Sequence, residues 1–422
     1  MSNAKTVLLI GGVDAHLERF TALGVKVVLI QHPDKVTEYQ ERAADVLIVA
    51  DYTDWDVVRP IAETARAVHG VQAVVSLTEP GVNPASRLGD LFGLTDGRRY
   101  EVSRRMRDKW LMRRHLAELG LPVPHAALVE DRASLDVFGE RAGYPFIVKP
   151  VSTTAGFGLL RAENPADLDR VWARVQELDG GRTDRGSTMF TVDGFLMESY
   201  IDGPEFSVEA LSFAGRHVVV AVTEKLTSED HFAELGHAVP ARLADADRAR
   251  LTGAVEEFLT GMGVVDGPSH TEIRLSSRGP VVIESHNRLG GDNIVELVEA
   301  AYGIDMIAYG AAWPLGLVEP LAAPPVAKGA AVMRAVLRRP GTVTAVSGVD
   351  AVRSRPDVLA AQVSVRPGDT VRPLRDNWDR LGSVVATAAD TDAAVELCER
   401  LVREEIRIDV EPEAAPVPAR VA

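Results

Sequence analysis

The stretch that decides the fold is residues 270–286, with the sequence His270-Thr-Glu-Ile-Arg-Leu-Ser-Ser-Arg-Gly-Pro-Val-Val-Ile-Glu-Ser-His286. Its first half alternates polar and apolar residues, so His270, Glu272 and Arg274 fall on one face of a predicted strand. The Ser-Ser-Arg-Gly segment is typical of a turn, and the apolar run after it predicts a second strand. The stretch therefore predicts a β-hairpin with a row of polar side chains on one face.

Two acidic side chains face each other in that hairpin. Symmetry about Arg278 places Glu272 opposite Glu284. The same register places His270 opposite His286. Directly opposed residues have Cβ atoms about 4.5–5.5 Å apart, where like charges repel, and a bound cation removes this repulsion. Two carboxylates with phosphate oxygens suit Mg²⁺, which prefers oxygen ligands; the alternative is a solvated sheet face that tolerates both glutamates.

A second signal combines a lysine with a flexible segment. Lys149 lies in the strand-like run Phe146-Ile-Val-Lys-Pro150, and residues 152–158 follow with the sequence Ser-Thr-Thr-Ala-Gly-Phe-Gly. Small residues let backbone amides approach phosphate groups, and a lysine adds a point charge. No Walker A pattern occurs in the chain. The alternative is a glycine-rich turn beside a lysine that extends its ammonium group to solvent.

The segment Glu198-Ser-Tyr-Ile-Asp-Gly-Pro-Glu-Phe-Ser-Val208 gives a third signal. Its Asp-Gly-Pro separates two predicted strands, and Glu205, Ser207 and Glu209 share one face of the second strand. A carboxylate at Glu205 can accept hydrogen bonds from ribose hydroxyls. The alternative is a turn followed by an exposed strand face.

The N-terminal part alternates strands and helices, which predicts a parallel, doubly wound sheet. Its first strand ends at Gly11-Gly12, which is not a G-x-G-x-x-G fingerprint, so no dinucleotide site is predicted. Strands are expected at residues 7–10, 25–30, 46–49 and 73–76, and strands dominate residues 195–283 around one helix at 248–262. Further expected elements are helices at 103–119, after Asn164-Pro165, from an N-cap at Asp292 to about 302, and at 392–405, with strands at 330–336 and 363–365.

Composition limits the class of protein. The chain has 422 residues, and its 61 acidic and 46 basic side chains give a net charge of −15, which argues against a dedicated nucleic-acid binder. Cys398 is the only cysteine, so no intramolecular disulfide can form, and a reducing cytoplasm is expected. We find no signal peptide and no apolar run of roughly 18 residues, so a cytoplasmic protein without a membrane span is expected.

These signals follow the order found in the ATP-grasp superfamily, which the chain resembles over nearly its whole length. The matching positions are Lys109, Lys149 with its Ser/Thr/Gly segment, Glu198, Glu205, Glu272, Glu284 and Arg288. The segments His270-Thr-Glu-Ile-Arg274 and Glu284-Ser-His-Asn-Arg-Leu-Gly-Gly-Asp292 are most similar to the L-amino-acid (dipeptide) ligase branch of carboxylate–amine ligases.

The resemblance implies an α/β and α+β architecture, the ATP-grasp fold, in which two α+β subdomains clamp ATP. The implied divisions are a Rossmann-like N-terminal domain at 1–103, a central lid subdomain at 104–192, a C-terminal ATP-grasp subdomain with the metal site at 193–325, a small α+β domain at 326–410 and a disordered tail at 411–422. The segments 152–158 and 180–188 are candidate lids that exclude water from a reactive intermediate.

The resemblance also implies a role for each matching residue. ATP is expected at Lys109, Lys149, Ser152, Thr153, Thr154, Gly156, Gly158, Glu198, Ser199, Tyr200, Ile201 and Glu205. Mg²⁺, with Mn²⁺ as a substitute, is expected at Glu272 and Glu284 with a third ligand from His286 or Asn287. Catalytic candidates are Arg288, Arg274 and His237, and substrate-binding candidates are Arg288, Gly290, Gly291, Asp292 and Glu209.

Two positions leave alternatives open. Many ATP-grasp enzymes carry Asn two residues after the second metal glutamate, where this chain has His286 followed by Asn287, so the third metal ligand stays undecided. His237 lies where the dipeptide-ligase branch often has a histidine near the substrates, and a loop histidine with satisfied hydrogen bonds is the alternative.

The implied function is an ATP- and Mg²⁺-dependent ligase that joins a small carboxylate to an amine, with amino acids as the expected substrates, through an acyl phosphate. A homodimer is a further expectation from the family. One alternative keeps the fold but activates bicarbonate or formate, as an ATP-grasp carboxylase or nucleotide-precursor ligase does. Another alternative, from a different class, is a non-catalytic ATP-binding regulatory module.

Overall fold

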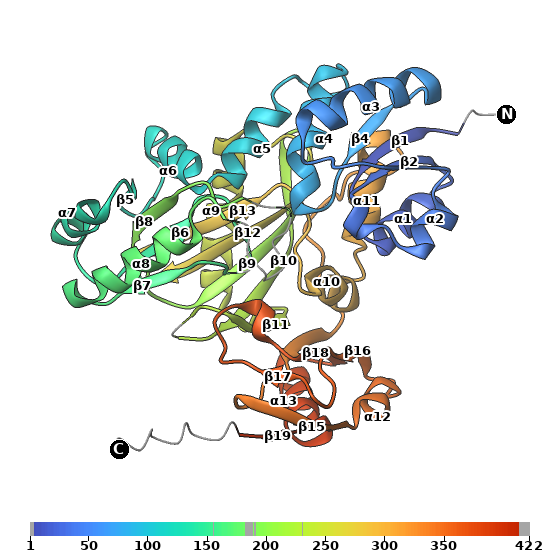
Figure 1. The fold of residues 1–422 in the computed structure, drawn as a ribbon. Coiled ribbons are helices and arrows are strands. Elements are labelled where there is room, and N and C mark those ends of the chain that lie inside the picture. Colours follow the sequence, from blue (N-terminus) through green and yellow to red (C-terminus); the bar gives the residue numbers. More distant parts are fainter. Residues whose placement is uncertain (1–3, 155, 182–188, 190, 230, 413–422) are drawn as a thin grey trace, which may run out of the picture.

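The computed structural model describes residues 4–154, 156–181, 189, 191–229 and 231–412. The described residues form four sheets with helices packed against them. In Figure 1 the N-terminal elements lie at the upper right, a lid with β5–β8 at the left and the C-terminal elements at the bottom. Over these residues, every helix is too short or too polar to cross a membrane.

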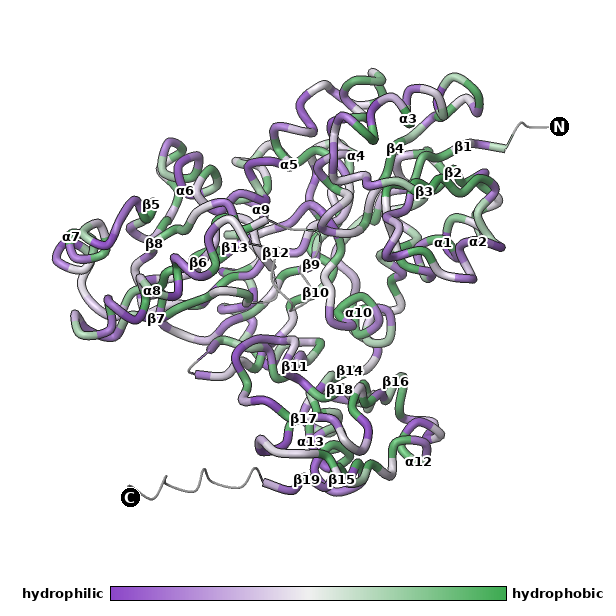
Figure 2. The backbone as a smooth tube through the Cα atoms, in the orientation of Figure 1, coloured by the Kyte–Doolittle hydropathy of each residue, from purple (hydrophilic) through white to green (hydrophobic). Residues whose placement is uncertain are grey.

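The N-terminal domain is built on a parallel sheet with the strand order β3-β2-β1-β4. In β1 (Thr6–Ile10), Val7 and Leu9 enter one hydrophobic cluster whereas Leu8 and Ile10 enter another, because both faces of the sheet are covered. Figure 2 shows hydrophobic residues along β1 and β2. The remaining elements are β2 (Lys26–Gln31), β3 (Val46–Val49), β4 (Ala73–Val75), α1 (Asp14–Ala22), η1 (Pro33–Lys35), α2 (Glu38–Ala43), α3 (Trp55–His69) and α4 (Glu79–Leu91). The predicted doubly wound sheet is confirmed.

The single helix expected at residues 103–119 is wrong, because two helices occupy this region. α5 spans Arg99–Arg107 and α6 spans Lys109–Glu118. Asp108 between them has an extended backbone, and its side chain accepts a hydrogen bond from Leu111 N at 2.9 Å. An aspartate N-cap of this kind starts a new helix, and here it makes Lys109 the first residue of α6.

The lid is an antiparallel sheet with the strand order β5-β8-β6-β7. Its strands are β5 (Ala126–Leu128), β6 (Phe146–Pro150), β7 (Leu160–Ala162) and β8 (Phe195–Ser199), and its helices are α7 (Arg132–Ala142), η2 (Pro165–Asp167) and α8 (Leu168–Leu178). Asn164 caps η2 by accepting a hydrogen bond from Ala166 N, as its sequence position predicts. Most of the polar segment 180–188 lies outside the described residues.

The largest sheet has eight strands in the order β13-β12-β9-β10-β11-β14-β18-β16. Its strands are β9 (Glu205–Phe213), β10 (Arg216–Thr227), β11 (Glu234–Val239), β12 (Gly267–Ser276), β13 (Gly279–His286), β14 (Ala330–Ala335), β16 (Val358–Val363) and β18 (Gly382–Ala388). Helices α9 (Asp245–Met262), α10 (Ile294–Tyr302), α11 (Met306–Ala312) and η3 (Trp313–Leu315) accompany it. Because β11 pairs with β14, this sheet runs across the predicted division at 325 and 326.

The C-terminal segment adds a small sheet of β15 (Gly341–Ser347), β17 (Thr370–Val371) and β19 (Arg407–Glu411). Its helices are α12 (Val349–Arg353), η4 (Asn377–Asp379), α13 (Thr391–Arg400) and η5 (Leu401–Glu405), the last of which is a π-helix turn. The strand expected at 363–365 occurs earlier, as β16, and ends at Val363. Most of the tail expected at 411–422 lies outside the described residues, whereas Glu411 belongs to β19.

The predicted hairpin forms from β12 and β13, and its opposed pairs are those expected. Glu272 pairs with Glu284, and His270 pairs with His286. The tight turn, however, pairs Ser276 with Gly279, a register in which Glu272 would face Ile283 instead. A shift between Glu272 and the next residue corrects this register. A β-bulge of this kind turns side chains to a different partner, and here it brings the two glutamates face to face.

Candidate active site

A cavity of about 340 Å³ brings together residues from the lid, the large sheet and the C-terminal segment. The predicted site residues that line it are Lys109, Lys149, Thr153, Thr154, Gly156, Glu198, Ser199, Tyr200, Ile201, Glu205, Glu272, Arg274, Glu284, Arg288, Gly291 and Asp292. The predicted residues outside its lining are Ser152, Gly158, Glu209, His237, His286, Asn287 and Gly290. Residues far apart in sequence thus converge on one enclosed space of the size expected for a small-molecule site.

Lys109 and Glu284 form one buried ion pair in this cavity. Lys109 Nζ lies 2.8 Å from Glu284 Oε2, and it also donates a hydrogen bond to Thr153 O at 2.9 Å. Burial alone would raise the pKa of Glu284, but the neighbouring Lys109 and His286 hold it well below its usual range. Glu284 is therefore ionised at neutral pH, and a cation is positioned beside it.

A second lysine is paired on the lid side. Lys149 Nζ lies 2.5 Å from Glu198 Oε2, and Arg113 Nε donates to Glu198 Oε1 at 2.5 Å. Burial opposes the charge on Glu198, but Arg113 and Lys149 lower the pKa of this carboxyl to about 2. Burial lowers the pKa of Lys149, and the charge of Glu198 opposes this effect.

Arg113 was not predicted, and it fastens helix α6 to the site. Its guanidinium donates to Val282 O at 2.9 Å and to Ile283 O at 2.7 Å, besides its bond to Glu198. It lies one helical turn after Lys109, so both side chains share a face of α6. This i, i+4 spacing is the sequence signal that could have identified it.

Lys225 was also not predicted, although it is the most connected cation of the cavity. Its Nζ lies 2.9 Å from Glu205 Oε1, 2.8 Å from Glu234 Oε1 and 2.8 Å from Glu272 Oε1. Burial would lower its pKa, but Glu234, Glu272 and Glu205 together raise the pKa of Lys225 well above its usual range. The only signal in the sequence is a lone lysine near the end of the apolar strand β10.

The facing glutamates fit a divalent ion. Burial, and after it the negative charge of Glu284, raise the pKa of Glu272, but Lys225 and the hydrogen bond with His270 oppose them and the pKa is lowered. Glu284 also has a depressed pKa, so both carboxylates are ionised. Two ionised carboxylates on paired strands are a donor set that suits Mg²⁺, which binds oxygen and retains waters.

The two candidates for a third metal ligand, His286 and Asn287, both lie outside the lining of the cavity. His286 Nε2 lies 3.2 Å from Glu284 Oε1, and its ring does not line the cavity. Asn287 lines a separate cavity of about 330 Å³ near Arg99 and Trp313. Asn287 lies in the bend after β13, which ends at His286.

Arg274, a catalytic candidate, is held beside Glu205 and Ile201. Its Nε and Nη2 each donate to Glu205 Oε2 at 3.1 Å, and Nη1 donates to Ile201 O at 2.7 Å. The guanidinium carbon also lies 5.4 Å from the ring centres of Tyr200 and of Phe232. These contacts fix Arg274 beside the turn after β8, so we interpret it as a residue that orients Glu205.

Glu209 was expected to contact substrate, but it is fully buried away from the cavity. It accepts hydrogen bonds from Ser207 Oγ at 2.7 Å and from His270 Nδ1 at 2.9 Å. Burial would lower the pKa of His270, but Glu209 raises the pKa of this imidazole to about 9. The alternating strand pattern predicted the shared face correctly but could not show that β12 covers Glu209.

Segment 152–158 approaches the cavity only in part. Thr153, Thr154 and Gly156 line it, and Thr153 Oγ1 donates to Phe157 O at 3.1 Å, whereas Ala155 lies outside the described residues. Gly158 has φ +71°, and a Cβ there would lie 2.9 Å from the Pro150 ring. Glycine at position 158 therefore lets the chain turn tightly against Pro150 at the end of segment 152–158.

Acidic and basic residues alternate along one wall of the cavity. Arg380 donates to both Asp292 oxygens, at 2.6 and 2.8 Å, and His237 Nε2 lies 2.8 Å from Asp292 Oδ2. Asp292 was expected to cap the following helix, but Asn293 is the N-cap of α10 and the Asp292 carboxylate turns toward Arg380 and His237. His237 is fully buried behind Asp292 and therefore reaches the cavity only through it.

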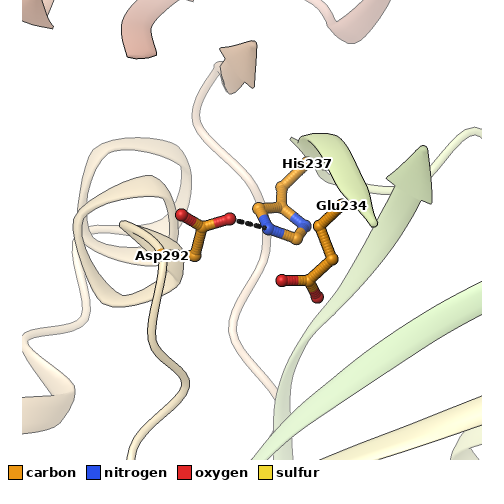
Figure 3. A group of neighbouring side chains, drawn as sticks. All are labelled: Glu234, His237 and Asp292. Carbon is orange, nitrogen blue, oxygen red and sulfur yellow. Dashed lines mark hydrogen bonds and ion pairs between the residues drawn. The ribbon is translucent and has the colours of Figure 1, made fainter. Parts of the chain in front are cut away.

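Glu234, His237 and Asp292 point toward one another in Figure 3, and their nearest ligand atoms lie within 4.8 Å. Glu234 exchanges hydrogen bonds with Asn377, whose Nδ2 donates to Oε2 at 2.6 Å and whose Oδ1 accepts from Glu234 N at 2.7 Å. Because an imidazole nitrogen suits Mg²⁺ poorly, we do not assign the Mg²⁺ site to this cluster. Glu234 and Asp292 of this cluster line the cavity together with Arg380 and give it a wall of mixed charge.

Arg288 connects the cavity to the N-terminal domain. Its Nε donates to Glu79 Oε2 at 2.8 Å, and Arg107 Nε lies 3.5 Å from Glu79 Oε1. Burial would raise the pKa of Glu79, but His286 and Arg288 hold it well below its usual range. Glu79 was not predicted; it starts α4 directly after β4, and ligand sites of parallel sheets lie at such carboxyl ends.

Comparisons with known proteins agree with this geometry. Residues 142–296 match the family model of the ATP-grasp domain, and residues 335–411 match that of the L-amino acid ligase C-terminal domain 2. The solved structure of an L-amino acid ligase from Bacillus licheniformis superposes with a TM-score of 0.82 at 21% identity, and the match covers 97% of this chain and 100% of that chain. The expected ATP-grasp fold is thereby confirmed.

Two curated relatives match over part of their length. The uncharacterized protein y4rH of Sinorhizobium fredii is 28% identical over 297 residues, which are 70% of this chain and 59% of that protein. Alanine–anticapsin ligase of Bacillus subtilis is 25% identical over 292 residues, which are 65% of this chain and 59% of that protein. The match with this chain thus spans 59% of the length of each relative.

The fold and the matched model define the class: this chain has the ATP-grasp fold, and its residues 142–296 match the ATP-grasp domain. Within that class it resembles the L-amino acid ligase branch, because its C-terminal segment matches the domain named after those enzymes.

Proposed function

We propose that this protein is an ATP- and Mg²⁺-dependent carboxylate–amine ligase. It forms an amide bond between two small molecules, which we take to be amino acids, and releases ADP and phosphate. The observation that carries this proposal is the pairing of three buried lysines with carboxylates around one cavity: Lys109 with Glu284, Lys149 with Glu198 and Lys225 with Glu272.

This pairing suits a site that binds a triphosphate together with its metal ion. Buried carboxylates and buried ammonium groups are costly without partners, and here each neutralises the other. When Mg²⁺ and ATP bind together, the ion can take the place of the lysines beside Glu272 and Glu284. Lys109 and Lys225 are then released from these carboxylates, and Lys109 together with Lys149 can bind phosphate oxygens and offset part of their negative charge.

ATP would lie along the lid side of this cavity. Backbone groups of Ser199, Tyr200 and Ile201 offer hydrogen bonds to the adenine, and Glu205 accepts from the ribose hydroxyls. Thr153, Thr154 and Gly156 cover the phosphates, and the cover excludes water. Glu272 and Glu284 would hold Mg²⁺ or Mn²⁺, which supplies neutralisation of charge on the transferred phosphoryl group.

In the first step, a carboxylate oxygen of one substrate attacks the γ-phosphorus of ATP, and the bond to the bridging oxygen of ADP breaks. The products are an acyl phosphate and ADP. Arg288 lies at the substrate end of the cavity and orients the carboxylate as its charge is transferred. Positioning of the substrates and electrostatic stabilisation of the transferred phosphoryl group accelerate this step, so no nucleophilic side chain is needed.

In the second step, the amine nitrogen of the other substrate attacks the acyl carbon, and phosphate leaves. Glu234 and Asp292 can receive the ammonium group of an amino acid, whereas Arg380 can receive its carboxylate. This mixture of charges supports a zwitterionic substrate over a large polyanion.

The proposal is tested by incubating the protein with ATP, Mg²⁺ and a matrix of amino acids against amines. We expect ADP release that requires two substrates, together with a product whose mass equals both substrates minus one water. Bicarbonate-dependent ADP release without any amino acid would overturn the proposal in favour of a carboxylase. Nucleotide binding without turnover of any pair would favour a regulatory module.

A further inference from the structure

Each glutamate of the hairpin has two neighbours, a lysine and a histidine. Glu272 Oε1 lies 2.8 Å from Lys225 Nζ and 3.4 Å from His270 Nε2. Glu284 repeats this pattern with a lysine on one oxygen and a histidine, 3.2 Å away, on the other. The lysines have long side chains that can move to a phosphate group, whereas the histidines are short and buried.

Both histidines are held from behind by a second carboxylate. His270 Nδ1 lies 2.9 and 3.0 Å from the two oxygens of Glu209, a side chain that is closed off from the cavity. His286 Nδ1 lies 2.9 Å from Glu79 Oε2 in an out-of-line ion-pair contact. Two carboxylate–histidine–carboxylate chains therefore end at the glutamates of the hairpin.

The strand register makes the two chains run side by side. Each histidine stands two residues from its glutamate on the same strand face, and His270 pairs directly with His286 across the hairpin. Their rings stack with 6.3 Å between centres and 20° between planes. Gly290 packs closely against the His270 ring, because a Cβ at this position would lie 3.0 Å from His270 Nδ1. Neither ring can turn away without disturbing the other.

We propose that His270 and His286 are positioning residues that aim Glu272 and Glu284 at the divalent ion, each braced by a buried carboxylate on its other ring nitrogen. The inference rests on the proposed function and assigns His286 to support of a ligand, not to the ion itself. When the lysines exchange onto phosphate, the histidines remain as the partners that keep both carboxylates in place. Residues that orient metal ligands in this way typically change metal affinity about 10- to 100-fold when removed.

A pair of amide variants separates the two ring nitrogens of His270. In His270→Asn, the amide reaches the place of Nδ1 and keeps the contact with Glu209 but loses the contact with Glu272. In His270→Gln, the longer amide reaches the place of Nε2 and keeps the contact with Glu272. The measurement is Mn²⁺ binding, followed by electron paramagnetic resonance with a non-hydrolysable ATP analogue present.

We expect His270→Asn to raise the Mn²⁺ dissociation constant at least about ten-fold and His270→Gln to raise it less than about three-fold. The matched control is His217→Asn, because His217 is a strand histidine whose one side-chain hydrogen bond among the described residues is with Ser212 Oγ, at 2.8 Å, on the neighbouring strand. This control should leave Mn²⁺ affinity unchanged. Thermal unfolding of each variant checks that the fold persists.

Wild-type Mn²⁺ affinity in a folded His270→Asn protein would overturn the inference, and so would equal losses in the Asn and Gln variants. If His270→Asn does not fold, the same Mn²⁺ titration is made with His286→Asn. We expect a loss of Mn²⁺ affinity of about ten-fold in that variant, and unchanged affinity would contradict the inference. A wild-type protein that binds neither Mn²⁺ nor the ATP analogue would instead overturn the proposed function itself.

Discussion

Two neighbouring regions of the cavity are built in different ways. At the metal end, Glu272 and Glu284 face each other on two consecutive strands, and their partners are mostly buried. Beside them lie Asn377, Trp378 and Arg380, here called the substrate wall, which belong to a 3₁₀ turn and the residue after it in the C-terminal segment. The metal end is part of a rigid sheet, whereas the substrate wall is a loop anchored at a few points.

From this difference we infer that the metal end determines the chemical step and the substrate wall determines which substrates react. Asn377 is fixed to Glu234 and Arg380 is fixed to Asp292, so the turn holds Trp378 between two anchors. The Trp378 side chain is nevertheless 55% exposed while it lines the cavity. Loops on a rigid scaffold commonly set specificity. We therefore expect changes at the metal end to abolish the reaction and changes in the wall to redirect it.

The largest effect is expected from Glu284→Gln at the metal end. The amide keeps the shape but loses the charge that holds Mg²⁺, so ADP release should fall at least about a hundred-fold while folding is preserved. Steady-state ADP release with saturating ATP measures this loss of turnover. The exposed Glu256→Gln is the control and should behave as wild type. Near-normal turnover of Glu284→Gln would remove the metal assignment.

Lys149→Ala should have the next largest effect. Loss of one charged contact to the phosphates is expected to raise the KM for ATP about ten-fold and to lower kcat. The effect should stay limited to this contact, because Glu198 keeps Arg113 as a partner. Initial rates over a series of ATP concentrations measure both constants. The exposed Lys35→Ala is the control. Unchanged ATP kinetics would contradict the placement of Lys149.

Trp378→Ala should act on one substrate only. Removing the indole takes apolar surface from the wall, so kcat/KM for amino acids with large apolar side chains should fall about ten-fold. The KM for ATP should change less than about two-fold. The control Leu359→Ala removes another exposed apolar side chain of the C-terminal segment, away from the cavity. A uniform loss over all amino acids would show that the wall does not set selectivity.

The smallest effect concerns stability toward acid. The pKa of Glu198 is lowered from 4.5 to about 2, so the folded state binds fewer protons than the unfolded state. This carboxylate therefore contributes stability that is present above pH 4.5 and is lost as the pH falls toward 2. Between pH 5 and pH 4, its share of the unfolding free energy should decrease by about 0.7 kcal/mol.

Urea unfolding at the two pH values measures this change, and Glu198→Gln serves as the matched variant. Stability of Glu198→Gln should depend less steeply on pH than that of the wild type, because the variant cannot take up the proton. Equal slopes would mean that Glu198 is not ionised in the folded protein.

The sequence predicted the metal end because the signal there is local. Alternation along β12 places His270, Glu272 and Arg274 on one face whatever the rest of the chain does. The opposed pairs were predicted correctly, yet the reason was incomplete, because the tight turn alone would pair Glu272 with Ile283 and a bulge restores the glutamate pair. Bulges leave no clear trace in a single sequence.

The remaining site residues depend on contacts between distant segments. Glu79 meets Arg288 across a separation of 209 residues, and Asn377 meets Glu234 across 143. The burial of Glu209 depends on β12 pairing beside β9. No periodicity within one segment encodes such contacts, so sequence patterns predicted many residues that line the cavity but not Asn377, Trp378 or Arg380.

The most direct test is a crystal structure with Mg²⁺ and a non-hydrolysable ATP analogue. Our account predicts Glu272 and Glu284 as ligands of the ion, with Lys109 and Lys149 moved onto phosphate oxygens. A nucleotide bound in the cavity while both glutamates keep their lysine partners and hold no metal would contradict it.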